Sequence, residues 1–300
     1  MKMALLVSLL AFASAAACGG GGSTASGPSC PTDQLAVVAA ENFWGSIATQ
    51  IAGGKACVIS IISNPNTDPH DYDAKPSDAR LVAGARYVIE NGAGYDPWLP
   101  RLLSANPSSR RRTLDVAELN GVKDGGNPHL WYSPACVNKV IERVTADLKT
   151  LDPANATYYD LQGAQYQSAG LKDYSDAIAA IKNRYAGTPI GASESVFEYM
   201  AAATGLTLIT PPGYMKAISE GADPSAADKA TVDQQVAGRQ IKVFVFNAQN
   251  STPDVKSVAD KARAAGIPVV PVTETLSPAS LSFQDWQTKQ LKSLLRALGG

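Results

Sequence analysis

The sequence predicts an α/β protein of two lobes, each a mainly parallel sheet flanked by helices, joined by one long helix. Short β-branched runs alternate with helical patterns along the chain, as in proteins with parallel sheets. A continuous helical pattern over residues 153–186 would make one helix about 50 Å long. The 300 residues suffice for two lobes, each of roughly 100 to 150 residues.

The first half of the chain carries four strand-like runs, at residues 35–40, 58–62, 87–90 and 113–115. Helical patterns lie between and after these runs, at residues 43–51, 76–84, 97–104 and 137–148. This alternation predicts a first lobe over residues 33–152.

The second half repeats the alternation after the long helix, which we expect to be interrupted near Gly170. Strand-like runs lie at residues 188–191, 207–209, 243–246 and 269–272, and helical patterns at residues 196–203, 227–235, 253–265 and 286–298. Residues 211–224 are rich in Pro and Gly, and we expect a long loop there. The second lobe is predicted over residues 187–300.

The N-terminus has the features of an export signal over residues 1–17: one Lys, a short apolar run and small residues. Small residues directly before Cys18 resemble a bacterial lipoprotein signal, which implies that Cys18 becomes lipidated. Ala15 stands where that pattern prefers Leu, so ordinary cleavage is the alternative. Residues 18–32 would then form a flexible tether. We expect an exported protein anchored to the outer face of the bacterial cytoplasmic membrane.

Three cysteines follow Cys18, and export predicts oxidising surroundings for them. Cys30 precedes the first strand-like run and Cys57 opens the second. Because parallel neighbours would start close together, we predict a disulfide between Cys30 and Cys57. Cys136 is expected to be an inert, buried thiol on a helix.

The charge balance argues against nucleic acid as a partner. The chain has 26 basic residues (Lys and Arg) and 27 acidic residues (Asp and Glu), which gives a net charge of −1. Such a chain has no electrostatic footprint for nucleic acid or for an anionic membrane surface. We expect a monomer whose contact with the membrane runs through the lipid on Cys18.

The only two histidines, His70 and His129, lie in matching contexts, Asp-Pro-His-Asp-Tyr and Asn-Pro-His-Leu-Trp. The Pro constrains the backbone, and the aromatic residue two positions later restricts the imidazole, as a metal ligand requires. A lone histidine is more often a surface or core residue, but the shared context of this pair favours metal binding.

The segments at residues 66–78 and 127–134 resemble the zinc/manganese substrate-binding proteins of ABC importers, and the similarity extends over roughly residues 33–298. The resemblance implies that an ion is held between the lobes by two His residues from the first lobe and two further ligands from the second. It assigns these roles to His70, His129, Glu194 and Glu274. The fourth ligand in the family is commonly Asp, so Glu274 is a departure.

The positions of these residues support the assignment independently. All four fall at or just beyond the carboxyl end of a strand, or in a loop leading into a helix, where open α/β sheets bind ligands. Two carboxylates offset the charge of a divalent cation. Four protein ligands leave no open position for an activated water, which favours capture over catalysis. Alternatively, Glu194 is a carboxylate at a helix start and Glu274 a solvated turn acid.

The resemblance implies an extracytoplasmic solute-binding protein, not an enzyme, that captures Mn²⁺ or Zn²⁺ for an ABC transporter permease, with Fe²⁺ as a further candidate. The absence of any other histidine favours Mn²⁺ slightly. One alternative is a receptor for a metal chelate, a siderophore or haem, which would need a wide cleft with Arg or aromatic walls. A metal-dependent hydrolase and a surface adhesin are the others.

Overall fold

The computed structural model describes residues 29–65, 67 and 72–300. The predicted export signal, Cys18 and His70 lie outside the described residues. No helix within the described part is both long and apolar enough to cross a bilayer.

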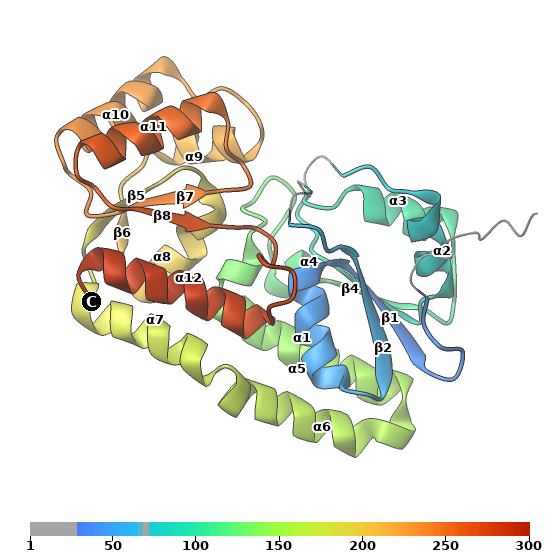
Figure 1. The fold of residues 1–300 in the computed structure, drawn as a ribbon. Helices are drawn as coiled ribbons and strands as arrows, with labels where there is room; N and C mark the ends of the chain where they lie inside the picture. Colours follow the sequence, from blue (N-terminus) through green and yellow to red (C-terminus); the bar gives the residue numbers. More distant parts are fainter. Residues whose placement is uncertain (1–28, 66, 68–71) are drawn as a thin grey trace, which may run out of the picture.

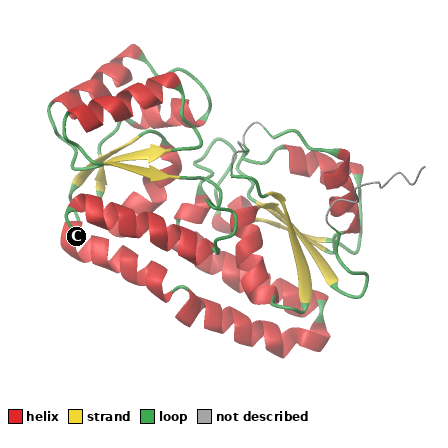
Figure 2. Ribbon diagram, in the orientation of Figure 1, coloured by secondary structure: helices red, strands yellow, loops and turns green. Residues whose placement is uncertain are grey.

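The first lobe is built on a parallel sheet with strand order β2-β1-β3-β4. The strands are β1 (Leu35–Glu41), β2 (Ala56–Ile62), β3 (Tyr87–Glu90) and β4 (Arg112–Asp115). Helices lie on both faces of this sheet in Figures 1 and 2: α1 (Asn42–Ala52), α2 (Pro76–Gly84), α3 (Trp98–Ala105), α4 (Val116–Asn120) and α5 (Pro134–Leu151).

Alternating side chains of β1 face two different cores. Val37 and Ala39 join the cluster that contains α1 and α5, whereas Val38 and Ala40 join a smaller cluster with α2 and α3. Successive side chains of a strand point to opposite faces, so a central strand covered on both sides reads as a continuous apolar run. The first strand of the chain is therefore buried along most of its length.

The second lobe repeats this topology with the order β6-β5-β7-β8, again all parallel. Its strands are β5 (Pro189–Ala192), β6 (Thr207–Leu208), β7 (Phe244–Asn247) and β8 (Val269–Val272). Its helices are α8 (Glu198–Thr204), α9 (Pro212–Ser219), α10 (Ala226–Ala237), α11 (Pro253–Ala264) and α12 (Phe283–Leu298). The predicted fold class is confirmed.

The connection between the lobes is a bent helix rather than a straight one (Figure 1). It comprises a short turn, η2 (Pro153–Asn155), then α6 (Ala156–Gln165), a π-helical turn, η3 (Tyr166–Gly170), and α7 (Lys172–Tyr185). The interruption lies where Gly170 predicted it. A Cβ atom at Gly170 would come within 2.6 Å of the Tyr166 ring, so the irregular turn depends on a glycine at this position.

One continuous cluster of buried apolar side chains connects the two lobes. It includes Trp44 and Trp131 from the first lobe and Phe197 and Phe244 from the second. Helix α12 packs along α7 and also reaches α1, where the Phe283 backbone N–H donates to Ser46 Oγ at 2.9 Å. The lobes therefore share an interior in addition to the connecting helix.

The structure corrects the expected loop at residues 211–224, because residues Pro212–Ser219 form helix α9. Tyr214, Met215 and Ile218 are buried at helical spacing on one face, and Pro212 stands in the first turn, where proline fits a helix. Amphipathic burial thus outweighs the Pro and Gly content. Cys136 lies on α5 as expected, but it is half-buried rather than buried.

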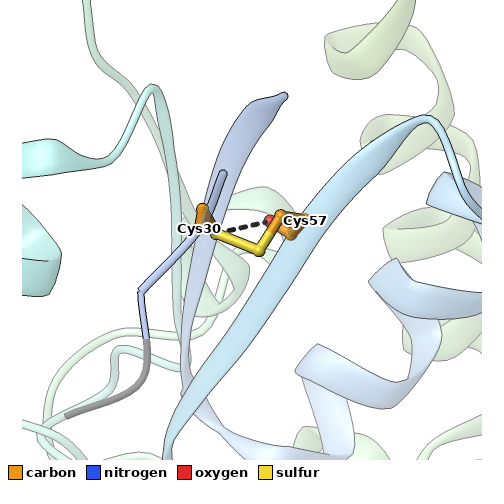
Figure 3. Close-up of a disulfide and its surroundings, with 2 residues drawn as sticks. All are labelled: Cys30 and Cys57. Carbon is orange, nitrogen blue, oxygen red and sulfur yellow. Dashed lines mark hydrogen bonds between the residues drawn. A yellow bond between two sulfur atoms is a disulfide. The ribbon is translucent and has the colours of Figure 1, made fainter. Parts of the chain in front are cut away.

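Cys30 and Cys57 are joined by a disulfide, with their Cα atoms 5.6 Å apart (Figure 3). The bond lies at the amino ends of β1 and β2, where Ala36 pairs with Cys57 in the parallel register. It therefore lies at the opposite end of the sheet from the carboxyl ends of the strands.

Candidate metal centre

Three of the four predicted ligands converge in the structure. One ligand atom each from His129, Glu194 and Glu274 lies within 4.8 Å of the others. The three residues are 0%, 0% and 1% exposed, so Glu274 is not a solvated turn acid. His70 is outside the described residues. The described part of the chain thus brings one imidazole from the first lobe against two carboxylates from the second.

The imidazole is held among aromatic rings. His129 immediately precedes the short helix η1 (Leu130–Tyr132), and its ring meets that of Trp131 edge-on, with centroids 5.2 Å apart. Trp131 in turn stacks on Phe43 of α1 at 4.0 Å. The aromatic residue two positions after the histidine therefore packs against the imidazole and limits its rotamers, as the sequence predicted.

Asn127 fixes the protonation pattern of this imidazole. Its Oδ1 accepts from the His129 backbone N–H at 3.1 Å and lies 2.8 Å from Nδ1 of the ring. Because an amide oxygen only accepts, Nδ1 carries a proton, and the neutral form of the ring presents the lone pair of Nε2. Nε2 lies 4.0 Å from Oε2 of Glu274, on the side where an ion would be shared.

The two carboxylates follow the strands on either side of β7. Glu194 comes after β5 and Glu274 after β8, on either side of β7 in the sheet. Asn247, the last residue of β7, is fully buried and donates from Nδ2 to both, at 2.6 Å to Glu194 Oε1 and 2.7 Å to Glu274 Oε1. A single amide therefore sets the spacing of the two acids.

Further donors complete the support of the carboxylates. Asn250 Nδ2 donates to Glu194 Oε2 at 2.8 Å, and the Tyr95 hydroxyl donates to Glu274 Oε2 at 2.7 Å. The backbone N–H of Glu274 donates to Gln249 Oε1 at 2.6 Å. The donors from Asn250 and Tyr95 stabilise the buried anions and orient them toward an ion, whereas the bond to Gln249 holds the Glu274 backbone in place.

Sequence reasoning missed these supporting residues, although one signal was available. Asn247, Gln249 and Asn250 directly follow a predicted strand at residues 243–246, at the same sheet edge as the proposed ligands. Tyr95 carried no such signal, because its contact with Glu274 spans 179 positions in sequence.

A second group of acids lies buried in the first lobe. Among the described residues, neither buried carboxylate oxygen of Glu41 has a hydrogen-bond partner on another residue, and burial, reinforced by Asp96 and Glu90, raises the pKa of Glu41 well above its ordinary value. Burial likewise raises the pKa of Glu90 to about 8. For Asp96 the pKa rises to about 6 through burial, against the lowering effect of backbone N–H donors from Asn91 and Gly92. Near pH 7 Glu41 and Glu90 therefore favour their protonated forms while Asp96 stays mainly ionised, so the three acids add less negative charge than their number implies.

The donor set suits a divalent transition metal. Imidazole and carboxylate ligands serve zinc, manganese and iron, and ligands bound at about 2.0–2.2 Å around a tetrahedral ion lie about 3.4 Å apart. The 4.0 Å between His129 Nε2 and Glu274 Oε2 needs only a small contraction to reach this spacing. This pair of ligand atoms therefore lies close to the separation that a shared ion would require.

Comparison with known proteins identifies the family of the chain. Residues 37–297 match the ZnuA family, described as zinc-uptake complex component A periplasmic. The manganese-binding lipoprotein MntA of Halalkalibacterium halodurans is 28% identical over 203 residues, which cover 63% of this chain and 64% of that protein. The high-affinity zinc uptake system protein ZnuA of Bacillus subtilis is 23% identical, with 94% of this chain and 90% of that protein covered.

The solved structures show the same architecture. The Mn-bound periplasmic metal binding protein from Candidatus Liberibacter asiaticus superposes with a TM-score of 0.72 at 21% identity, covering 87% of this chain and 98% of that one. At this identity the likeness concerns the fold. Because the family match extends over most of the sequence, the chain belongs to the ZnuA family, which confirms the resemblance to the zinc/manganese substrate-binding proteins of ABC importers.

Proposed function

We propose that this protein captures a divalent transition metal ion, Mn²⁺ or Zn²⁺, outside the cytoplasm and delivers it to the permease of an ABC importer. The observation that carries the proposal is the buried convergence of His129, Glu194 and Glu274. Two relatives named for manganese binding and zinc uptake support the same conclusion.

His70 would be the fourth ligand. Its Asp-Pro-His-Asp-Tyr context parallels that of His129, and the resemblance to the family assigns it this role. Two neutral imidazoles with two carboxylates would neutralise a divalent ion and fill a tetrahedral shell with protein atoms. Such a shell favours transport over catalysis, since a catalytic metal keeps a position for water.

Both ions suit the ligands, for different reasons. Two carboxylates favour the harder Mn²⁺, while Zn²⁺ binds most nitrogen and oxygen sites more tightly. The choice in the organism would therefore depend on metal availability as well as on the protein.

Release of the ion would require the second lobe to shift, because its carboxylates complete the shell. The shared apolar interior and the packing of α12 on both α7 and α1 restrict that shift to a modest rotation. The proposed lobes, residues 33–152 and 187–300, would thus move slightly about the linking helix at residues 153–186.

The N-terminal features support a location outside the cytoplasm. Residues 1–17 would act as an export signal, Cys18 would carry a lipid, and residues up to 32 would tether a monomeric body to the membrane. The disulfide between Cys30 and Cys57 fits an oxidising compartment.

A chelate receptor is less well supported. A cavity of 740 Å³ opens between the lobes beside the candidate metal centre. Within the described residues its lining includes Lys216 but no Arg and no aromatic side chain, and these are the groups expected to hold a siderophore or haem. A bare ion is therefore the favoured ligand.

Metal binding by the purified, chelator-stripped protein tests the proposal. Mn²⁺, Zn²⁺, Fe²⁺ and Ca²⁺ would be titrated while melting temperature and calorimetric heat are recorded. A ligand at 100 times its Kd adds about 2.7 kcal/mol to the free energy of unfolding. His129→Ala and Glu274→Ala should abolish the shift, and Glu142→Ala, an exposed acid on α5, should not. No shift with any transition metal would refute the function.

A further inference from the structure

Asn127 connects the imidazole of the first lobe to the second lobe. While its Oδ1 accepts from His129, its Nδ2 donates to the Ser195 carbonyl at 2.9 Å and to Glu198 Oε2 at 2.8 Å. The Tyr199 hydroxyl donates to the Asn127 carbonyl at 2.9 Å. Because the His129 backbone N–H can only donate and the Ser195 carbonyl and Glu198 carboxylate accept, these partners determine the orientation of the amide.

The same residues form a wall between the candidate metal centre and the inter-lobe cavity. Asn127, Ser195 and Asn250 line the 740 Å³ cavity, and each also contacts a proposed ligand. Ser195 Oγ lies 3.4 Å from His129 Nδ1, and Asn250 bonds Glu194. Within the described part of the chain, one layer of polar side chains therefore separates the buried cluster from the cavity.

The three clustered residues are at most 1% exposed, so an ion that passes from this cavity to the cluster must cross the layer formed by the described residues. The bond from Asn127 to Glu198 crosses between the lobes at the edge of the cavity. It is charge-assisted, so breaking it costs more than breaking an ordinary surface contact.

Building on the proposed function, we propose that the hydrogen bond between Asn127 and Glu198 is a latch that governs passage of the metal ion between the inter-lobe cavity and the candidate metal centre. In this role Asn127 is a positioning residue: it holds the His129 ring in its ligating orientation and ties that ring to α8. Separation of Asn127 from Glu198 and Ser195 would open the polar layer for the ion to enter or leave.

The test replaces the hydrogen-bond donor of Asn127 with an acceptor. Asn127→Asp keeps an acceptor for His129 but places a carboxylate against Glu198, so the latch opens. We expect the dissociation rate of Mn²⁺ or Zn²⁺, measured by stopped-flow chelator competition, to rise about tenfold. An added negative charge beside His129 would by itself retain the cation longer, so faster dissociation identifies the latch rather than the charge.

The second half of the test restores the latch. In the double variant Asn127→Asp with Glu198→Gln, the glutamine amide can donate to the new carboxylate, although the Ser195 carbonyl still lacks its donor. The rate should therefore fall back toward that of the original protein, below that of Asn127→Asp alone. Glu198→Gln alone keeps an acceptor for Asn127 but removes the charge assistance, so its rate should lie between those of the original protein and of Glu198→Ala. Glu142→Gln on α5 is the matched control and should leave the rates unchanged.

Association rates distinguish a latch from a loss of ligand geometry. An open latch raises the association rate as well as the dissociation rate, whereas a displaced ligand raises only the latter. If Asn127→Asp fails to fold, Glu198→Ala opens the latch from the other lobe without touching the partner of His129, and its dissociation rate should rise as well.

Unchanged or slower dissociation in Asn127→Asp and Glu198→Ala, or a double variant as fast as Asn127→Asp, would overturn the latch. The latch and the function fail in distinguishable ways. If the unmodified protein binds no metal, the function is wrong; if it binds metal with rates that these variants do not alter, only the latch is.

Discussion

The hydroxyl of Tyr95, in the first lobe, donates a hydrogen bond of 2.7 Å to Oε2 of Glu274, in the second. Oε2 is the atom that lies 4.0 Å from His129 Nε2. A side chain of the first lobe therefore helps to stabilise a carboxylate of the second at the point where the proposed ion would bind.

Replacing Tyr95 by Phe should destabilise the metal-free protein more than the metal-loaded protein. The buried carboxylate would lose a donor worth about 1.5–3 kcal/mol, whereas a bound cation would compensate much of that loss. Urea unfolding with chelator and with excess Mn²⁺ would measure the difference. Tyr185→Phe on α7 is the control, and an equal loss under both conditions would contradict the prediction.

Replacing Asn247 by Leu should weaken metal binding by about 10-fold to 100-fold, the usual cost of removing a group that orients metal ligands. Asn247 donates to both Glu194 and Glu274, so its loss removes one donor from each of the two acids. Isothermal titration would give the Kd, and Asn138→Leu at an exposed position of α5 would serve as control. An unchanged Kd would show that Asn247 only fills space.

The stability of the metal-free protein should fall as pH rises from about 4.5 to about 8. Burial, together with Asp96, Asp115 and Glu118, raises the pKa of Glu90 to about 8 from the ordinary 4.5. Over this interval the folded protein keeps a proton that the unfolded chain releases, so the free energy of unfolding decreases with pH. Glu41 contributes with the same sign, because its pKa is also raised.

Glu90→Gln should flatten this dependence without abolishing it, because the amide resembles the protonated acid at every pH. Urea titrations at several pH values between 5 and 8, with chelator present, would show it. A slope identical to that of the original protein would mean that Glu90 ionises in the folded state without cost.

Removing the disulfide should lower the free energy of unfolding by about 3.5 kcal/mol, from the entropy of closing a loop between positions 27 apart. The double variant Cys30→Ala with Cys57→Ala should nevertheless bind metal as before, since the bond lies at the amino ends of β1 and β2. Denaturant unfolding and metal titration of the same preparation would check both parts. A weakened Kd would reveal coupling across the length of the sheet.

Much of the fold was predictable because its strands are short apolar runs. All eight expected strands are present, and β3 and β8 have the predicted bounds. Helix α9 was missed because Pro and Gly composition concealed the spacing of Tyr214, Met215 and Ile218. Burial against neighbouring elements decides such segments, and composition alone does not report it.

The site was predictable in part for a related reason. The resemblance to the family assigned His129, Glu194 and Glu274, and their positions after strands or in loops between elements supported the assignment. The contacts of Tyr95 with Glu274 and of Asn127 with Glu198 depend on how the lobes face each other. No local pattern encodes that arrangement, and a single sequence does not contain it.

The apolar interior shared by Trp44, Trp131, Phe197 and Phe244 has a consequence for thermal denaturation. Unfolding of either lobe would expose the apolar side chains of the other lobe to water. A state in which only one lobe is unfolded is therefore unstable, and both lobes should unfold in one cooperative transition. A molecule that looks bipartite in its chain tracing would thus behave calorimetrically as a single unit.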